Sequence, residues 1–424
     1  MKILIVNTSN RGGGAAIAAV RLKTALLNLG EKPRMLVATK EGNDFTTIGL
    51  KSAWRYKLCW AFERLGIFLR QGLSKAHLWD IDPATHGVDI TALPEFKEAD
   101  IIHLHWVNQG FLSFKILNKV LHSSKLVVWT MHDAWTFTGL CHSPLECTAF
   151  RRECGNCMLL RRAGQNDWSH RLWRRKQALL EGTGRLVFVA CSRWLADMAR
   201  SSTLLADRTV VDIPNPIDTH LFTPGDKEQA RMLLGLPQGK SLILFSAYSV
   251  NAPIKGLTYL REALAQMAEA EPSVRDRVAV VLTGRGAEQM AEPMPVEAIP
   301  MGYVTDPKRM ALIYNAVDAF CLPSLQENLP NTIMEAKACG VPTVAFRVGG
   351  IPQMIDHRVD GYLAEPKDAA DLAQGLRWVL AADAASMRQL NRAAAVEQYS
   401  EARVAERYLK LYQQLIDHGK PVAD

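Results

Sequence analysis

The sequence predicts an α/β protein made of two Rossmann-like domains, each built on a doubly wound parallel sheet. Short apolar runs rich in β-branched residues alternate with helical patterns, which is typical of such sheets. The alternation is interrupted by the proline-rich stretch "DIPNPIDTHLFTPGD" (212–226) and then starts again. The chain has 424 residues, which is too long for one ordinary core.

The expected strands of the first domain are almost wholly apolar, so we expect both of their faces to be buried. They lie at 2–8, 33–39, 100–106, 125–133 and 185–192. A helical pattern follows the first of them and ends at Gly30.

The second domain repeats this pattern, with expected strands at 241–249, 278–286, 298–306, 318–324 and 341–350. We place the first domain at 1–214, with a C-terminal helix at 400–424 packing back on it, and the second domain at 215–399. Two such domains joined by a proline-rich hinge predict a cleft between them, with ligands at the carboxyl ends of the strands.

The charge is uneven along the chain, although the net charge is only +7. Residues 1–214 contain 29 lysines and arginines against 18 aspartates and glutamates, and the remaining residues contain 21 against 25. A basic first half favours an anionic partner, such as a phosphorylated substrate or an anionic membrane surface. The usual nucleic-acid-binding motifs do not occur in the sequence, so we expect no nucleic acid partner.

The N-terminal apolar run is too short for a secretion signal, and no apolar stretch is long enough to span a membrane. We therefore expect a cytoplasmic protein. Two segments, 51–77 and 167–180, mix Trp and Phe with Lys and Arg at helical spacing. Such helices either lie peripherally on the inner membrane or pack on the domain with solvated basic faces.

Two glutamates flank the start of an expected helix in the second domain. Glu327 lies in the loop after the strand 318–324, and Glu335 lies inside the helix that Gly340 ends. Pro330 suits the first turn of this helix, where its missing N–H costs nothing. The N–H groups of that turn can bind a diphosphate, and each carboxylate can accept two vicinal hydroxyls of a sugar. The alternative is that both glutamates are solvated surface charges.

Two further loops could contact a diphosphate. Lys255 and Gly256 follow the first strand of the second domain, where glycine permits close approach and lysine supplies charge. Gly12, Gly13 and Gly14 follow the first strand of the first domain, but they lack the full dinucleotide-binding spacing and also fit a simple tight turn.

Taken together, these motifs resemble those of retaining glycosyltransferases of family 4, which have the GT-B fold. The similar segments are "TMHD", "VACSRWL", "IPNPID", the "KG" turn and "PSLQENLPNTIMEAKACGVPTVA", in this order over nearly the whole chain. The segments "SNRGGGAAIAAVRL" and "HLHWVNQGFLS" resemble members that build bacterial capsules, exopolysaccharides or O-antigens.

The resemblance implies a role for each matching residue. Glu335 would hold the ribose of a nucleotide-sugar donor, UDP- or GDP-linked, and Glu327 would contact its hexose. Lys255, next to Gly256, would neutralise the departing diphosphate, and His132 would lie beside the reacting sugar. Gly13 and Gly14 would lie near the diphosphate and the acceptor. Backbone groups would hold the diphosphate and the hydroxyls of the donor sugar at Asn328, Leu329, Pro330 and Asn331.

The resemblance also implies catalysis without a metal, because lysine and a helix N-terminus can stabilise the leaving diphosphate. The acceptor would be a growing, lipid-linked glycan. Two departures weaken the diphosphate site: "NLP" (328–330) replaces a common Gly-Phe-Gly, and Ser249 stands where relatives often have arginine. Arg285 could compensate for that arginine. The rival functions are a nucleotide-sugar epimerase, a glycogen-type transferase and a non-catalytic nucleotide-sugar-binding adaptor.

Two other features point to metals. Four cysteines cluster at Cys141, Cys147, Cys154 and Cys157, and the last pair has the spacing of a zinc site. Structural zinc, disulfides and free thiols remain the alternatives for this cluster. The "DID" at 80–82 has the spacing of a metal–diphosphate motif of a different fold, and we interpret it as turn chemistry.

Overall fold

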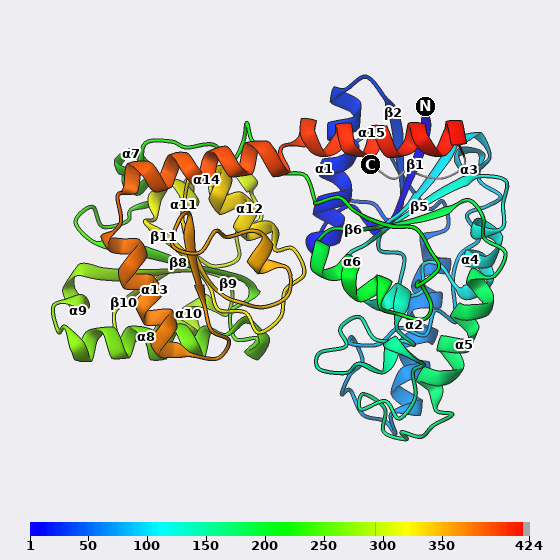
Figure 1. Ribbon diagram of the computed structural model, residues 1–424, viewed down its shortest axis with the longest axis horizontal. Helices are drawn as coiled ribbons and strands as arrows, with labels where there is room; N and C mark the ends of the chain where they lie inside the picture. Colours follow the sequence, from blue (N-terminus) through cyan, green and yellow to red (C-terminus); the bar gives the residue numbers. More distant parts are fainter. Residues whose placement is uncertain (293, 419–424) are drawn as a thin grey trace. The chain divides into compact units, whose positions relative to one another are not determined.

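The computed structural model describes residues 1–292 and 294–418. The chain forms two compact units (Figure 1). The first contains Met1–Pro216 and the described part of Val404–Asp424, and the second contains Ile217–Arg403. The boundary at 216/217 lies inside the proline-rich stretch.

The first unit contains a parallel sheet in the order β3-β2-β1-β4-β5-β6-β7. Its strands are β1 (Lys2–Ser9), β2 (Lys32–Thr39), β3 (Thr47–Gly49), β4 (Ile101–Leu104), β5 (Leu126–Met131), β6 (Leu186–Ala190) and β7 (Val210–Asp212). The order shows that the chain starts in the middle of the sheet and winds outward in both directions, as a doubly wound sheet requires. The five strands predicted for this domain are confirmed as β1, β2, β4, β5 and β6. The edge strands β3 and β7 were not predicted.

Successive side chains of β1 point to opposite faces, and both faces are buried. Ile3 and Ile5 join a core with α1 (Gly14–Asn28) and α15 (Glu401–His418), whereas Leu4 and Val6 join the core on the other face. This double burial explains the continuous apolar runs. The other helices of the unit are α2 (Ala53–Arg70), α3 (Pro94–Glu98), α4 (Phe114–Leu121), η1 (Trp135–Phe137), η2 (Ala149–Arg151), α5 (Trp168–Leu180) and α6 (Arg193–Arg200).

The helix α15 is joined to the sheet of the first unit by polar groups as well as by apolar packing. The hydroxyl of Tyr408 lies 2.9 Å from Thr130 Oγ1, and the hydroxyl of Tyr412 lies 2.6 Å from His103 Nδ1. The expected C-terminal helix reached to residue 424, and its part from 419 onward lies outside the described residues.

The second unit contains a parallel sheet in the order β10-β9-β8-β11-β12-β13. Its strands are β8 (Ser241–Ser249), β9 (Val278–Arg285), β10 (Glu297–Pro300), β11 (Ala319–Leu322), β12 (Thr343–Phe346) and β13 (Gly361–Ala364). Its helices are α7 (Lys227–Leu234), η3 (Pro253–Lys255), α8 (Leu257–Ala270), α9 (Val274–Arg277), α10 (Ala287–Ala291), α11 (Pro307–Ala316), α12 (Asn331–Ala338), η4 (Ile351–Gln353), α13 (Ala369–Ala381) and α14 (Ala384–Tyr399). The prediction of a second parallel α/β domain is therefore confirmed.

The order of this second sheet places β8 beside β11, although many residues separate them in the sequence. The loops that leave their carboxyl ends therefore start at neighbouring points of one sheet edge, where parallel sheets hold their ligands. None of the helices within 1–292 and 294–418 combines the length and the apolar character that crossing a bilayer requires.

Candidate functional site

The loop that follows β8 is a tight turn, and it places Lys255 directly before α8. Gly256, between η3 and α8, has φ +74°, a conformation that residues with a Cβ rarely adopt. A Cβ built on Gly256 would lie 1.9 Å from the carbonyl oxygen of Pro323, just after β11. Glycine is therefore needed here both for its backbone conformation and for the close approach of the two loops.

The loop that follows β11 places Glu327 against Lys255. The N–H of Leu325 donates a hydrogen bond of 2.8 Å to the carbonyl of Ile254, which joins the two loops. The ammonium Nζ of Lys255 lies 2.6 Å from Glu327 Oε1. Two predicted site residues that lie 72 positions apart are thus brought into direct contact.

A third loop, which follows β12, supports the backbone of Glu327. Gly350 donates its N–H to the carbonyl of Glu327 at 3.1 Å. Gly349 has φ +56°, and a Cβ there would lie 1.7 Å from the same carbonyl oxygen. The sequence reasoning did not identify these glycines, although the pair "GG" directly after an apolar strand was a usable signal.

The helix α12 begins directly after this loop and contains Glu335. Pro330 is its N-cap residue, and no side chain caps the helix by a hydrogen bond. Leu329 and Pro330 are buried, whereas Asn328 and Asn331 are partly exposed. Glu335 is 8% exposed and accepts a hydrogen bond of 3.2 Å from the hydroxyl of Tyr314, which sequence reasoning also missed.

Arg285 lies next to the position where relatives often have arginine. In the pairing of β8 with β9, Ser249 is opposite Arg285. The guanidinium Cζ lies 4.8 Å from the ring centre of Tyr248 and 5.3 Å from that of Tyr303, so two aromatic rings hold the cation. Ser249 instead bonds its own loop, with its hydroxyl 2.6 Å from Asn251 Oδ1.

In the first unit, the glycine-rich loop joins β1 to α1. Gly13 is the N-cap residue of α1, and residues 11–14 are exposed. A Cβ built on Gly12 or Gly13 would meet no atom within 4 Å. The loop is therefore a helix N-terminus that faces open space.

His132, directly after β5, belongs to a buried group of histidines. Its Nε2 lies 2.9 Å from Nδ1 of His105, and the rings of His105 and His103 are 4.3 Å apart. Burial lowers the pKa of His132 to about 4, so its imidazole is neutral at physiological pH. The structure therefore equips His132 to exchange a hydrogen bond rather than to supply a positive charge.

Two of these histidines were not predicted as site residues. Burial, together with the neighbouring His103 and His132, holds the pKa of His105 well below its usual value. Nε2 of His105 is buried, and it has no hydrogen-bond partner among the described residues. The pattern "HLHW" at the end of β4 was a usable signal, because β4 pairs directly with β5.

Asp133 and His142 form a half-buried ion pair beside Trp106. Asp133 Oδ2 lies 2.7 Å from Nδ1 of His142 and accepts a bond of 2.9 Å from the indole N–H of Trp106. Burial alone would lower the pKa of His142, but the charge of Asp133 raises it above its usual value. Burial alone would raise the pKa of Asp133, but His142 holds it below its usual value. Each group therefore favours the charged form of the other.

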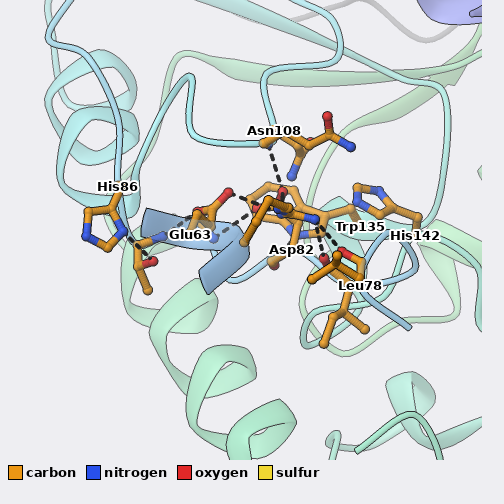
Figure 2. Close-up of polar contacts among 12 residues, drawn as sticks. Glu63, Leu78, Asp82, His86, Asn108, Trp135 and His142 are labelled. Atoms are coloured by element: carbon orange, nitrogen blue, oxygen red, sulfur yellow. Dashed lines mark hydrogen bonds and ion pairs between the residues drawn. The ribbon is translucent and has the colours of Figure 1, made fainter. Parts of the chain in front are cut away.

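A second buried network lies close to this pair, as Figure 2 shows for Glu63, Asp82, Trp135 and His142. The guanidinium of Arg64 lies 3.0 Å from Asp82 and 3.3 Å from Glu63. The carbonyl of Asp82 accepts the indole N–H of Trp135 at 2.8 Å. Burial, with the charge of Asp82, raises the pKa of Glu63 to about 8. The "DID" segment is a turn only at Asp80, because Ile81 forms an isolated bridge with Cys141, and Asp82 is a structural centre of the unit.

The structure does not support the zinc interpretation of the four cysteines. Among the residues that the structure describes, no group of three or more His, Cys, Asp or Glu side chains is arranged to hold a metal ion. All four cysteines, Cys141, Cys147, Cys154 and Cys157, are free. Burial raises the pKa of Cys141 to about 12 and that of Cys154 to about 11, so both remain thiols. The Sγ of Cys154 instead accepts the N–H of Gly139 at 3.1 Å, which ties the loop to itself.

Comparison with known proteins connects the second unit to one family. Residues 240–382 match the family model described as Glycosyl transferases group 1. This range contains every residue of the Lys255–Glu327 site and the helix α12.

Curated relatives share part of the chain. A D-inositol 3-phosphate glycosyltransferase of Geodermatophilus obscurus is 33% identical over 213 residues, which are 46% of this chain and 47% of the relative. D-inositol 3-phosphate glycosyltransferase 1 of Catenulispora acidiphila is 31% identical over 55% of this chain and 60% of the relative. The chain thus spans about half the length of the curated relatives that it matches.

Solved structures share the whole fold. Sucrose-phosphate synthase from Thermosynechococcus elongatus matches with a TM-score of 0.64 and 19% identity, over 98% of this chain and 99% of that one. HepE of Anabaena, solved in complex with UDP, matches with a TM-score of 0.64 and 17% identity, over 98% and 100%. The chain therefore has the GT-B fold, and its residues 240–382 match the Glycosyl transferases group 1 family.

Proposed function

We propose that this protein is a retaining glycosyltransferase that moves a hexose from a nucleoside-diphosphate sugar to a growing, lipid-linked bacterial surface glycan. The observation that carries the proposal is the contact of Lys255 with Glu327 beside the start of α12. The match of residues 240–382 to a glycosyltransferase family supports it.

The proposed donor site has a cationic part and an acidic part. Lys255, whose side chain is 31% exposed, can contact a diphosphate while it stays close to Glu327. The positive end of the helix dipole of α12 favours the same anion. The Glu327 carboxylate can accept hydroxyls of the hexose, and Glu335 can accept those of the ribose. HepE, which shares the fold, was solved with UDP, and this is consistent with such a donor.

Arg285 would add a second cation to this site. It lies on the strand next to Ser249, and the rings of Tyr248 and Tyr303 hold it at the carboxyl end of the sheet. We expect Arg285→Ala to raise the donor KM about ten-fold or more, which is the usual cost of losing a hydrogen bond to a charged group. Arg275→Ala, at another exposed arginine of the second unit, is the matched control.

In the proposed reaction, an acceptor hydroxyl attacks the anomeric carbon on the face that the diphosphate leaves. The bond between this carbon and the diphosphate oxygen breaks, and the hydroxyl proton passes to the departing diphosphate. Lys255 stabilises the charge that develops on the leaving group more than it stabilises the bound donor, so it lowers the barrier. His132, Gly13 and Gly14 remain predicted contacts of the reacting sugar and diphosphate, and a loss of turnover in His132→Ala is the corresponding test.

The acceptor has a second candidate. The curated relatives are named D-inositol 3-phosphate glycosyltransferases, which suggests a small phosphorylated cyclitol instead of a lipid-linked glycan. Transfer assays should therefore offer both acceptor classes. For the proposed acceptor we expect action at the cytoplasmic face of the inner membrane.

The test is a product assay with a panel of UDP- and GDP-sugars. We expect one donor to be hydrolysed slowly without acceptor and to be consumed faster with the right acceptor. Glu327→Gln should remove both activities, whereas Glu288→Gln, on α10 in the same unit, should leave them intact. If a donor binds but none turns over, the protein is a non-catalytic adaptor, and if no donor binds or turns over, the proposal is wrong.

A further inference from the structure

The helix α2 of the first unit exposes a continuous row of large apolar side chains, which we call the α2 apolar row. Each side chain is between 46% and 61% exposed, and they are Trp54, Leu58, Phe62, Leu65 and Leu69. Their spacing of four, four, three and four positions keeps them on one side of a helix that turns about 100° per residue. Single exposed apolar residues are ordinary on a protein surface, but a row along a whole helix marks an interaction surface.

The opposite side of α2 is anchored in the unit, so the helix cannot turn the row inward. Tyr56 packs edge-on against Phe111, with ring centres 6.4 Å apart. Glu63 and Arg64 point to the same side and belong to the buried network around Asp82 (Figure 2). Rotation of the helix would break the buried Arg64–Asp82 ion pair and the contact with Glu63, which is a costly change.

One end of the row has the composition of a water–lipid boundary. Trp54 is exposed at the first turn of α2. Trp79 is also exposed, but it does not mark the other end, because its ring lies 6.1 Å from that of Trp60 and 5.5 Å from the guanidinium Cζ of Arg64, both in the middle of α2. Tryptophan is enriched at this boundary in membranes because its ring is apolar and its N–H is polar.

The exposed charged side chains of residues 51–75 are all basic, and the nearest exposed acidic residue along the chain is Asp80, next to Trp79. The exposed charged residues of 51–75 are Lys51, Arg55, Lys57, Arg70 and Lys75. Glu63 is the only acidic residue that the sequence has in this range, and it is buried. A second copy of the chain would bring these cations against the same cations, which is unfavourable. An anionic surface would instead be attracted to them.

We propose that the α2 apolar row docks the protein on an anionic lipid bilayer, with α2 lying in the plane of the interface. The apolar side chains would enter the boundary between headgroups and acyl chains along a helix of about 27 Å. The basic side chains would contact lipid phosphates. The docking itself does not depend on the proposed function. Only its purpose, which is to bring the enzyme to a lipid-linked acceptor, rests on that function.

The test is co-sedimentation of the full chain with vesicles of phosphatidylcholine, with and without phosphatidylglycerol, at low and high salt. We expect binding only to the anionic vesicles, and weaker binding at high salt because the charges are screened. Leu58→Ser with Phe62→Ser and Leu65→Ser should reduce binding more than ten-fold. The control is Met232→Ser with Leu233→Ser, which changes apolar side chains on α7 that are more exposed than those of the row.

A charge series separates the electrostatic contribution. Arg55→Gln with Lys57→Gln should weaken binding roughly 25-fold, because each basic residue near an anionic surface contributes about five-fold. Lys308→Gln with Arg309→Gln, on α11, is its control. In a further measurement, brominated lipids should quench part of the tryptophan fluorescence of the unmodified protein, and Trp54→Phe should lose part of this quenching.

Three results would overturn the proposal. The first is a wild-type protein that does not sediment with anionic vesicles, and the second is a triple serine variant that binds like the wild type. The third is a wild-type dimer that the triple serine substitution makes monomeric, which would identify the row as a contact between copies. Donor hydrolysis in detergent-free buffer is measured on the same variants. If hydrolysis persists while binding is lost, only docking is affected, whereas wild type without hydrolysis contradicts the proposed function.

Discussion

Replacing Gly256 with alanine tests whether the turn before α8 must approach the end of β11. Alanine at φ +74° has a backbone cost of about 1–2 kcal/mol. Its Cβ would also lie 1.9 Å from the Pro323 carbonyl oxygen, so the two loops must separate. Such overpacking typically costs about 1–3 kcal/mol, which gives about 2–5 kcal/mol in total.

Gly235, which ends α7, provides the matched control. It has φ +68°, and a Cβ there would meet no atom within 4 Å. Gly235→Ala should therefore cost only the backbone term of about 1–2 kcal/mol. The difference between the two variants isolates the close approach of the loops.

The assay is calorimetric unfolding of both variants together with donor affinity. We expect Gly256→Ala to lower the Tm of the second unit about twice as much as Gly235→Ala, or more. Because Lys255 precedes Gly256 directly, donor affinity should fall in Gly256→Ala alone. Equal Tm shifts with unchanged donor affinity in both variants would refute this reasoning.

The remaining predictions concern the first unit. Glu63→Gln should flatten the pH dependence of the free energy of unfolding. The pKa of Glu63 is about 8 in the folded protein, above its usual value of 4.5. The neutral carboxyl therefore contributes its full stabilisation below pH 4.5, and this stabilisation is lost as the pH rises towards 8. Urea unfolding at several pH values measures this, and an unchanged slope would count against a neutral Glu63. Asp133→Asn should lower the pKa of His142, because it removes the charge that raises this pKa. An NMR titration in which the pKa of the His142 ring is the same in the variant and the wild type would contradict the ion pair. Treatment with a chelator should leave the Tm unchanged, since no metal-holding group exists among the described residues, and a marked drop would restore the zinc interpretation of the cysteines.

Much of the fold was predictable because both sheets are buried on both faces. A strand such as β1 then shows an uninterrupted apolar run, which is easily recognised. The edge strands β3 and β7 have only three residues each, too few for a pattern. An edge strand pairs with a neighbouring strand on one side only, so a segment of three residues is sufficient there.

The candidate site was predictable residue by residue but not as an arrangement. Lys255 and Glu327 each follow an apolar strand, and this made them visible in the sequence. Their contact depends on β8 lying beside β11, a long-range pairing that no local pattern encodes. Tyr314 was missed for the same reason, because it reaches Glu335 from α11, a different helix.

The cysteine loop shows the opposite failure, in which spacing alone was misleading. The last pair, Cys154 and Cys157, has the separation of zinc ligands, but a zinc site needs three or four such side chains around one point. The described residues contain no such group. The structure buries Cys154 and directs its sulfur to a backbone N–H. Burial could not be read from a loop rich in arginine and glycine.

The most direct test of the Lys255–Glu327 site is the affinity of UDP and GDP for the wild-type protein and for Lys255→Met, measured by isothermal titration calorimetry. We expect one nucleotide to bind the wild type, and we expect the loss of the ammonium to weaken this binding by about ten- to a hundred-fold. Lys240→Met, at another lysine of the second unit, should bind as the wild type does. Equal affinity in wild type and Lys255→Met would contradict a diphosphate site at the Lys255–Glu327 pair.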